Sequence, residues 1–259
     1  MQPIDPHQFL DKALALALTA GERIIEIYAS DFTVEVKGDQ SPVTKADIEA
    51  EEIILKGLSE AFPELPVVAE ESVSAGKVPE IGNQFVLVDP LDGTREFTSR
   101  NGAFTVNIAF VENNVPIVGV IHAPALNRTF GGVVGDTAFE VIDGVREAIS
   151  VRKADPNAII AVASRSYRDE KTDAYLAESA VKDTRSIGSS LKFCLVATGE
   201  ADIYPRFGRT MEWDVAAGHA ILSAAGGSVT REDGSPFLYG KQNQAHDADF
   251  ANPGFIARA

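Results

Sequence analysis

The sequence predicts a fold in two parts, an α+β half followed by an α/β half. Two observations predict it: the first part of the chain reads as helices followed by a run of strands, and the second part alternates strands with helices. The pattern changes near residue 150, so we expect one half at 1–150 and the other at 151–259. A chain of 259 residues can form one large domain or two modest ones with most of its apolar surface buried.

Two amphipathic helices are expected in the first half. Apolar residues recur at helical spacing over residues 6–29, which predicts one long helix. Apolar and polar residues then alternate over 32–37, which is typical of a strand. Thr44 followed by Asp47 resembles a capping box with aspartate in place of glutamate. It predicts the start of a second helix that runs to about Phe62.

Short apolar segments follow, and their lengths suit strands better than helices. Strands are expected at 66–69, 85–88, 104–111, 117–122 and 129–134. The second of these should end at Asp89-Pro90, and Asn113-Asn114 should form a hairpin turn between the third and the fourth.

Strands and helices alternate in the second half. We expect strands at 159–163 and 203–205, and helices at 170–181, 191–198 and 214–225. The last helix is rich in small residues and should stop at Gly226-Gly227.

The charge of the chain limits its partners. A formal net charge of −15 repels nucleic-acid polymers and anionic membranes, although bound metals or a few basic residues can still create a site for a small anion. No apolar run approaches the roughly 18–20 residues of a membrane span, and residues 1–11 lack the features of a signal peptide. Cys194 is the single cysteine, which fits a reducing compartment. We therefore expect a cytoplasmic protein without an integral membrane segment; peripheral attachment to the inner membrane and the oligomeric state stay open.

Several carboxylates lie at the ends of apolar strands or at helix starts. They are Glu70, Asp89, Asp92 and Asp214, with Asp47 as a fifth candidate. An unpaired buried carboxylate costs several kcal/mol, and basic residues are scarce beside these positions. Hard divalent cations would compensate the charge, and an all-oxygen ligand set favours Mg²⁺ or Mn²⁺. Taken one at a time, each acid could equally be a helix cap or a surface charge.

The segment Asp89-Pro90-Leu91-Asp92-Gly93-Thr94 is no generic turn. Asp89 and Asp92 bracket a bend at which Gly93 lets the backbone approach a ligand closely. The N–H groups of Gly93 and Thr94 would then open a short helix, which favours phosphate binding there.

This segment, followed by Glu96-Phe97, resembles the first signature of the inositol-monophosphatase-like phosphatases. Residues 213–218 (Trp-Asp-Val-Ala-Ala-Gly) resemble the second, residues 69–72 match the family's upstream acidic pair, and Lys37 with residues 43–47 matches its early loop and helix start. The resemblance spans essentially the whole chain. It implies the layered αβαβα sandwich shared by inositol monophosphatases and fructose-1,6-bisphosphatases.

The resemblance also implies two or three Mg²⁺ ions per site. Glu70, Asp89 and the backbone carbonyl of Leu91 would bind one ion, and Asp89, Asp92 and Asp214 a second. Such a pair of ions promotes direct attack of water on phosphorus, with no phosphorylated residue. Inhibition by Li⁺ is implied as well.

Two further residues would act on the attacking water. The resemblance implies that Glu70 and Thr94 orient it, and that Asp47 supports Thr94 or a third, weaker metal ion.

Within this superfamily, other stretches are similar to the bacterial 3'(2'),5'-bisphosphate nucleotidases of sulfate assimilation. They are residues 94–97, 100–109, 122–124, 163–166, 188–194, 201–206 and 211–214. The implied reaction is hydrolysis of 3'-phosphoadenosine 5'-phosphate to AMP and phosphate. Ser189, Lys192 and Arg206 fall where such enzymes contact the nucleotide and its 5'-phosphate, while Gly93 and Thr94 would bind the scissile phosphate.

Three other interpretations remain open. The chain could be an inositol monophosphatase, a histidinol-phosphate phosphatase, or a metal-binding regulator without catalysis. The complete set of acids and Thr94 argues against the last. Lys192 and Arg206 could each be ordinary surface bases.

Overall fold

The computed structural model describes residues 3–36, 42–164 and 169–259. Its helices are α1 (Pro6–Tyr28), α2 (Lys45–Ala61), α3 (Glu70–Ser74), α4 (Thr94–Thr98), α5 (Glu170–Glu178), α6 (Leu191–Ala197) and α7 (Glu212–Ala224), with a 3-10 turn at Pro124–Leu126. None of the helices in these ranges is long and apolar enough to cross a membrane.

Two large sheets form the framework. The first has the order β3-β4-β5-β6-β7-β8-β9, and its strands are β3 (Val67–Ala69), β4 (Gln84–Asp92), β5 (Thr105–Glu112), β6 (Val115–Ala123), β7 (Arg128–Val133), β8 (Thr137–Ile142) and β9 (Val145–Ala148). The second has the order β11-β10-β12-β16-β14, and its strands are β10 (Ile159–Ser164), β11 (Val181–Ile187), β12 (Ile203–Arg206), β14 (Ser228–Arg231) and β16 (Phe255–Arg258). Two small pairs join β1 (Val34–Val36) to β2 (Pro42–Thr44) and β13 (Thr210–Met211) to β15 (Ala251–Asn252).

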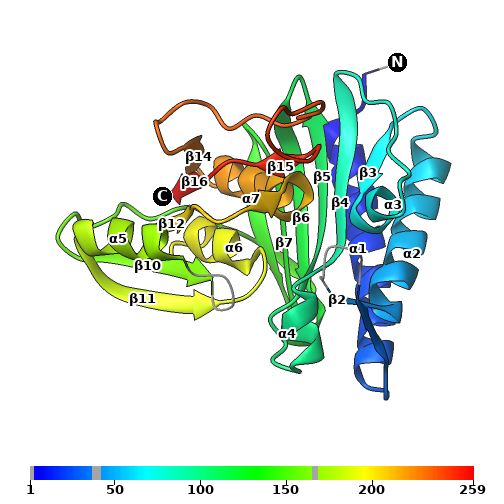
Figure 1. Ribbon diagram of the computed structural model, residues 1–259, viewed down its shortest axis with the longest axis horizontal. Helices are drawn as coiled ribbons and strands as arrows, with labels where there is room; N and C mark the ends of the chain where they lie inside the picture. Colours follow the sequence, from blue (N-terminus) through cyan, green and yellow to red (C-terminus); the bar gives the residue numbers. More distant parts are fainter. Residues whose placement is uncertain (1–2, 37–41, 165–168) are drawn as a thin grey trace.

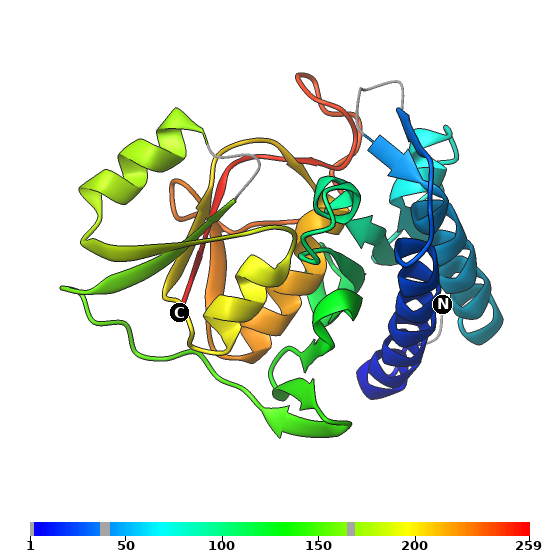
Figure 2. The same cartoon turned by 90° about the horizontal axis from the view of Figure 1, so that it is seen from below.

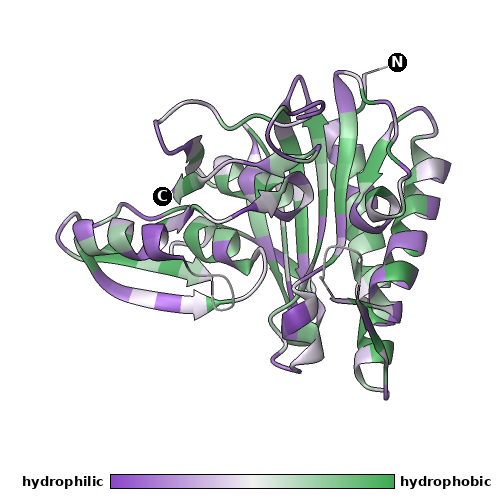
Figure 3. Cartoon of the chain, in the orientation of Figure 1, coloured by the Kyte–Doolittle hydropathy of each residue, from purple (hydrophilic) through white to green (hydrophobic). Residues whose placement is uncertain are grey.

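Helices and sheets alternate in five layers, which confirms the predicted αβαβα sandwich (Figures 1 and 2). The helices α1 and α2 cover the outer face of the seven-stranded sheet, where Phe9 and Ile54 pack against Val88 and Phe110. The helices α6 and α7 lie between the two sheets, and α5 covers the far face of the five-stranded sheet through Leu176. Figure 3 shows the hydrophobic residues concentrated along the central strands, where both faces are covered.

The N-terminal elements follow the local sequence signals closely. Helix α1 has the predicted bounds to within one residue, and α2 opens with the predicted capping box. In that box the Thr44 N–H donates to Asp47 Oδ2 at 2.7 Å, and Thr44 Oγ1 accepts from the Ala46 N–H at 3.1 Å. The predicted strand at 32–37 is shorter in the structure, as β1, and its last residue Lys37 lies outside the described residues.

One strand boundary was wrong. Strand β4 does not end at Asp89-Pro90 but continues to Asp92, with a shift of register between Asp89 and Asp92 against β5. Asp89 pairs with Asn107 and Asp92 with Thr105, so the three-residue step on β4 faces a two-residue step on β5. Pro90 lies within the three-residue step of β4, between the paired residues Asp89 and Asp92, so its missing N–H removes no regular hydrogen bond between the strands.

Other elements were missed or mis-assigned. Strands β8 and β9 form a hairpin around Asp143-Gly144, both at positive φ, and this turn signal is visible in the sequence. The helix expected at 170–181 ends at Glu178, and β11 begins at Val181. Strand β11 lies at the edge of its sheet and consists mostly of polar residues, so its sequence shows no apolar pattern. The short strand β2 and the C-terminal strands were not predicted either.

The boundary expected near residue 150 falls between the two large sheets. The last strand of the first sheet ends at Ala148, and the first strand of the second begins at Ile159. Helix α7, from the second half, nevertheless packs on the first sheet through Ala217 and Ile221. The division into 1–150 and 151–259 as separate units stays a prediction.

Candidate active site

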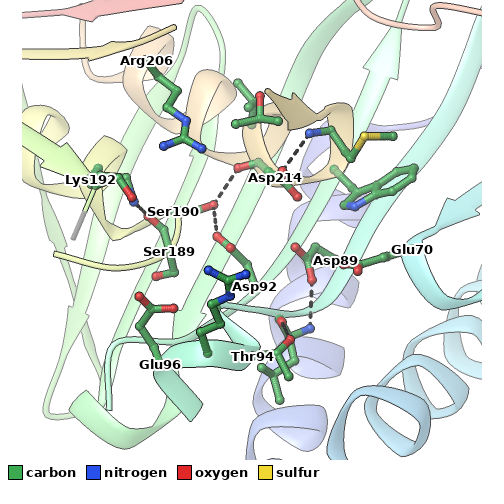
Figure 4. Close-up of a pocket in the computed structure, with 18 of the residues that line it drawn as sticks. Glu70, Asp89, Asp92, Thr94, Glu96, Ser189, Ser190, Lys192, Arg206 and Asp214 are labelled. Carbon is green, nitrogen blue, oxygen red and sulfur yellow. Dashed lines mark hydrogen bonds between the residues drawn. The ribbon is translucent and has the colours of Figure 1, made fainter. Parts of the chain in front are cut away.

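Nearly all the predicted site residues line one pocket of about 300 Å³. They are Glu70, Asp89, Leu91, Asp92, Gly93, Thr94, Ser189, Lys192, Arg206 and Asp214. Asp47 is buried and contacts the pocket through Thr94 (Figure 4 shows the pocket). Residues that are far apart in the sequence therefore meet at one place, where the ends of β3 and β4 face the start of α7.

The pairing of β3 with β4 explains why two of the acids are neighbours. The strands are parallel, and Ala69 pairs with Val88. Glu70 directly follows Ala69 at the start of α3, and Asp89 directly follows Val88 within β4, so both lie at the carboxyl end of β3, at one edge of the sheet. Carboxyl ends of parallel strands commonly form ligand sites in this way.

Three carboxylates converge at this edge. Glu70, Asp89 and Asp214 each offer an oxygen, and these atoms all lie within 4.8 Å of one another. Asp89 is buried and is also held by its own loop, since the Leu91 N–H donates to Asp89 Oδ1 at 3.0 Å. Asp214 reaches the group from the first turn of α7, where its Oδ2 accepts from the Met211 N–H at 2.7 Å.

Asp92 is not part of this group of three. Its Oδ2 lies 2.7 Å from Ser190 Oγ and 3.5 Å from Asn107 Nδ2. Asp92 nevertheless lies close enough to the group for its charge to raise the pKa of Asp214. The ligand role of Asp92 stays a prediction.

The charge of these acids calls for a cation. Burial, together with the Asp92 and Glu70 carboxylates, raises the pKa of Asp214 to about 8. Burial likewise raises the pKa of Asp92, although Lys192 and Ser190 oppose the shift. Closely spaced oxygen ligands with raised pKa values fit a hard divalent cation such as Mg²⁺, which would compensate the charge in place of protons.

A second contact links the pocket to helix α2. Thr94 Oγ1 donates to Asp47 Oδ1 at 3.1 Å, while Asp47 Oδ2 accepts from both the N–H and the hydroxyl of Thr44 at 2.7 Å. Burial, and to a smaller extent the nearby Glu70, raises the pKa of Asp47 to about 6. The predicted pairing of Thr94 with Asp47 is therefore present in the structure.

Gly93 makes the bend before α4 feasible. Its φ is +97°, in the left-handed region, and a Cβ here would meet the carbonyl oxygen of Ala103 at 3.2 Å. A side chain at this position would therefore be strained and crowded. As predicted, a short helix begins directly afterwards, at Thr94.

The opposite part of the pocket is basic. Lys192 and Arg206 are both buried, and Figure 4 shows them across the pocket from Glu70. Lys192 Nζ contacts the carbonyl oxygen of Ser189 and stands 5.3 Å from the centre of the Tyr204 ring. Burial lowers the pKa of Lys192 to about 8, while Asp92 acts in the opposite direction. One Nη of Arg206 donates to the carbonyl oxygen of Arg209 at 3.3 Å.

Sequence reasoning missed Ser190, which connects the acidic and basic parts. Its Oγ lies 2.7 Å from both Asp92 Oδ2 and the carbonyl oxygen of Asp214, and it accepts from Asn107 Nδ2 at 2.9 Å. The sequence contains two adjacent serines, and only Ser189 was chosen. Ser190 is the N-cap residue of α6, where serine is common, although its side chain makes no capping hydrogen bond and bonds within the pocket instead. Arg165 and Ser166, in a stretch of the nucleotidase resemblance, lie outside the described residues.

Comparison with known proteins places this pocket in a family. The family model described as "Inositol monophosphatase family" matches residues 5–258. The chain belongs to the inositol monophosphatase family. It is 45% identical to the 3'(2'),5'-bisphosphate nucleotidase CysQ of Escherichia coli (strain K12) over 248 residues, which cover 95% of this chain and 98% of that protein.

Solved structures agree with this family membership. A crystal structure of CysQ from Bacteroides thetaiotaomicron, a bacterial member of the inositol monophosphatase family, has a TM-score of 0.79 and 39% sequence identity, covering 97% of both chains. An inositol monophosphatase from Anabaena has a TM-score of 0.77 and 27% identity, covering 97% of this chain and 90% of that one.

For this member of the inositol monophosphatase family, we expect Mg²⁺ to stabilise the fold more strongly at pH 8 than at pH 6. Asp214 and Asp47 have raised pKa values in the folded state, about 8 and about 6, so the folded chain binds more protons than the unfolded one. Without metal, their contribution to stability is therefore complete at low pH and is lost as the pH rises through these values. Cations that replace the protons should bind more tightly as the pH rises.

The measurement is a melting curve in EDTA and in Mg²⁺ at each pH. At 100 times its dissociation constant, Mg²⁺ should add ~2.7 kcal/mol, or roughly 5–10 °C for a chain of this size. Equal increments at both pH values would contradict proton competition at these carboxylates.

Proposed function

We propose that the chain is a Mg²⁺-dependent 3'(2'),5'-bisphosphate nucleotidase that hydrolyses 3'-phosphoadenosine 5'-phosphate to AMP and inorganic phosphate. One observation carries the proposal: a single pocket contains both a group of converging carboxylates and two buried bases, Lys192 and Arg206. A small monophosphate needs only the carboxylate part of the pocket with its metal ions. A bisphosphate nucleotide also needs a basic subsite for its second phosphate, away from the carboxylates. The names of the CysQ relatives support the same substrate class.

The acidic part of the pocket is proposed to bind Mg²⁺. Glu70, Asp89 and the Leu91 carbonyl would bind one ion, and Asp89, Asp92 and Asp214 a second; Asp47 could support a third, weaker ion. When bound, the ions would activate the attacking water and neutralise charge that develops on the phosphate.

The attacking water is proposed to be oriented by Thr94 and Glu70. Because Thr94 Oγ1 donates its proton to Asp47 Oδ1, at 3.1 Å, its lone pairs can accept a hydrogen bond from water. The Glu70 carboxylate can accept the second hydrogen. The water oxygen then forms a bond to phosphorus as the bond between phosphorus and the 3'-oxygen breaks. The water releases one proton to solvent, and the 3'-oxygen takes up one proton from solvent and leaves as the hydroxyl of AMP.

The substrate is proposed to lie across the pocket. The N–H groups of Gly93 and Thr94 suit the scissile phosphate, at the left-handed turn before α4. Lys192 and Arg206 would bind the 5'-phosphate, and Ser189 would help to position the nucleotide. Arginine favours bidentate phosphate contacts, and lysine acts as a point charge.

The same proposal covers the cellular setting. A bisphosphate nucleotidase of this type would act in the cytoplasm on a by-product of sulfate assimilation, and Li⁺ would inhibit it by competing at the oxygen-lined metal site.

Arg206→Ala tests the nucleotidase assignment. We expect kcat/KM for 3'-phosphoadenosine 5'-phosphate to fall by about 10- to 100-fold, the ~1.5–3 kcal/mol of a charge-assisted hydrogen bond. The loss can include kcat, because a remote contact also positions the reacting phosphate. Inositol monophosphate does not reach this subsite, so its slow hydrolysis should hardly change. The measurement is phosphate release from both compounds and from histidinol phosphate, with and without Mg²⁺.

Arg231→Ala, which removes an exposed arginine on β14, is the control and should leave both rates unchanged. Equal losses on both substrates in Arg206→Ala would mean that this arginine supports the fold or the metal site. A wild-type preference for inositol or histidinol phosphate would overturn the nucleotidase assignment but would leave a metal-dependent phosphatase.

A further inference from the structure

Helix α2 carries a second buried carboxylate, one turn beyond Asp47. The Glu51 side chain belongs to a residue that is only 5% exposed. Its Oε2 accepts from the Glu71 N–H at 2.8 Å, and its Oε1 accepts from Ser72 Oγ at 2.6 Å. Both oxygens of this carboxylate are therefore used by the next helix along the chain, α3.

These two contacts supply a helix cap that the local sequence lacks. The N-cap residue of α3 is Ala69, which has no polar side chain, so the first N–H groups of the helix need a partner from elsewhere. Glu51 provides an acceptor from a residue 20 positions earlier in the chain, and its negative charge also suits a helix N-terminus. Glu70 is the first residue of this capped turn, so the direction of its side chain depends on how that turn is held.

The position of Glu51 on α2 adds to its importance. Asp47 and Glu51 are four residues apart, which places them on one face of the helix. Asp47 accepts a hydrogen bond from the Thr94 hydroxyl at the start of α4, and Glu51 accepts one from the Glu71 N–H at the start of α3. One rigid helix therefore contacts both elements whose first residues, Glu70 and Thr94, are proposed to act on the attacking water.

We propose that Glu51 is a positioning residue for Mg²⁺ binding: it caps α3 from a distance and thereby aims the Glu70 carboxylate at Asp89 and Asp214. Glu51 itself binds neither the metal nor the substrate. The inference rests on the proposed function, because it assumes that Glu70 is a metal ligand. Groups that orient a ligand typically contribute about 10- to 100-fold to metal affinity or activity.

The test is Glu51→Leu, which keeps a side chain of similar size but removes both oxygens that accept from the Glu71 N–H and from Ser72 Oγ. Mg²⁺ affinity, measured by titration calorimetry on the metal-free protein, should weaken about 10- to 100-fold. The Mg²⁺ concentration for half-maximal phosphatase activity should rise by the same factor, while KM for the nucleotide at saturating Mg²⁺ should stay unchanged.

Two further variants make the result specific. Glu52→Gln, at the exposed neighbouring position, removes the same charge from α2 and should bind Mg²⁺ like the wild type. Ser72→Ala removes only one of the two contacts, so it should weaken Mg²⁺ binding in the same direction by a smaller factor. It keeps the inference testable if Glu51→Leu does not fold.

The outcomes separate this inference from the proposed function. If the wild type binds Mg²⁺ and Glu51→Leu binds it equally well, the inference is overturned and the proposed function stands. A lower melting temperature in EDTA with unchanged Mg²⁺ affinity would assign Glu51 a purely structural role and would also overturn it. If the wild type itself binds no Mg²⁺, the proposed metal site fails, and the inference fails with it.

Discussion

Replacement of Asp89 by asparagine should remove nearly all phosphatase activity. A metal contact at the reacting phosphate contributes several kcal/mol to transition-state stabilisation, and each 1.36 kcal/mol is a factor of ten; we therefore expect kcat to fall by about 10³-fold. Asp89 is the most critical position because it is buried, belongs to the converging carboxylates and is proposed to contact both ions. The measurement is kcat for 3'-phosphoadenosine 5'-phosphate at several Mg²⁺ concentrations.

The same variant should fold at least as well as the wild type when no metal is present. Asparagine keeps an oxygen for the Leu91 N–H, which donates to Asp89 Oδ1 at 3.0 Å, and it removes one negative charge from a group of carboxylates that repel one another. In EDTA its melting temperature should therefore equal or exceed that of the wild type, and added Mg²⁺ should raise it little.

The control for this substitution is Asp31→Asn, at an exposed position after α1, which should change neither kcat nor the response to Mg²⁺. An Asp89→Asn enzyme with kcat within a few-fold of the wild type would contradict the metal role. A clear loss of stability in EDTA would show instead that Asp89 is needed for the fold.

Local signals explain which parts of the fold could be predicted. Helical periodicity located α1, the Thr44–Asp47 capping box located the start of α2, and Asn113-Asn114 adopts positive φ at the predicted hairpin turn. Each of these signals depends on residues within one or two turns of each other. The full αβαβα layering could be expected only from the resemblance, because it depends on how distant segments pack.

The missed elements have non-local causes. Strand β11 is held by parallel pairing with β10 and exposes most of its polar side chains, so neither periodicity nor composition distinguishes it from a loop. Strand β4 passes Pro90 because the register shift places that residue outside the regular ladder. Neither feature is visible before the pairing partner is known.

The site residues likewise divide into those that local chemistry predicts and those that depend on how distant segments pack. The chemistry of the acids pointed to Glu70, Asp89 and Asp214, whose side chains do converge. Side-chain direction is not predictable from the sequence, so Ser190, which contacts Asp92, was passed over for Ser189. The contact of Glu51 with α3 joins residues about 20 positions apart, and a buried glutamate on a helix gives no local signal of such a partner.

Replacement of Thr94 by valine should lower kcat by about 10²–10³-fold, the loss typical for one positioned transition-state interaction. Valine keeps the branched shape but removes the hydroxyl that donates to Asp47 Oδ1 at 3.1 Å, so the attacking water loses its orienting acceptor. KM should change little, because the N–H groups of Gly93 and of residue 94 remain for the phosphate. Steady-state kinetics at saturating Mg²⁺ measure both constants.

Two matched variants decide whether the hydroxyl is the cause. Thr94→Ser restores a hydroxyl and should recover most of kcat, whereas Thr98→Val, on the same helix, removes a hydroxyl that contacts the Arg95 carbonyl oxygen and should have no effect. Because the Thr94 hydrogen bond lowers the pKa of Asp47 and burial raises it, Thr94→Val should raise that pKa above its value of about 6. The remaining activity should therefore depend on a more alkaline pH than in the wild type if ionised Asp47 is required. Near-normal kcat in Thr94→Val would assign the orientation of the water to another group, with Glu70 the first to test.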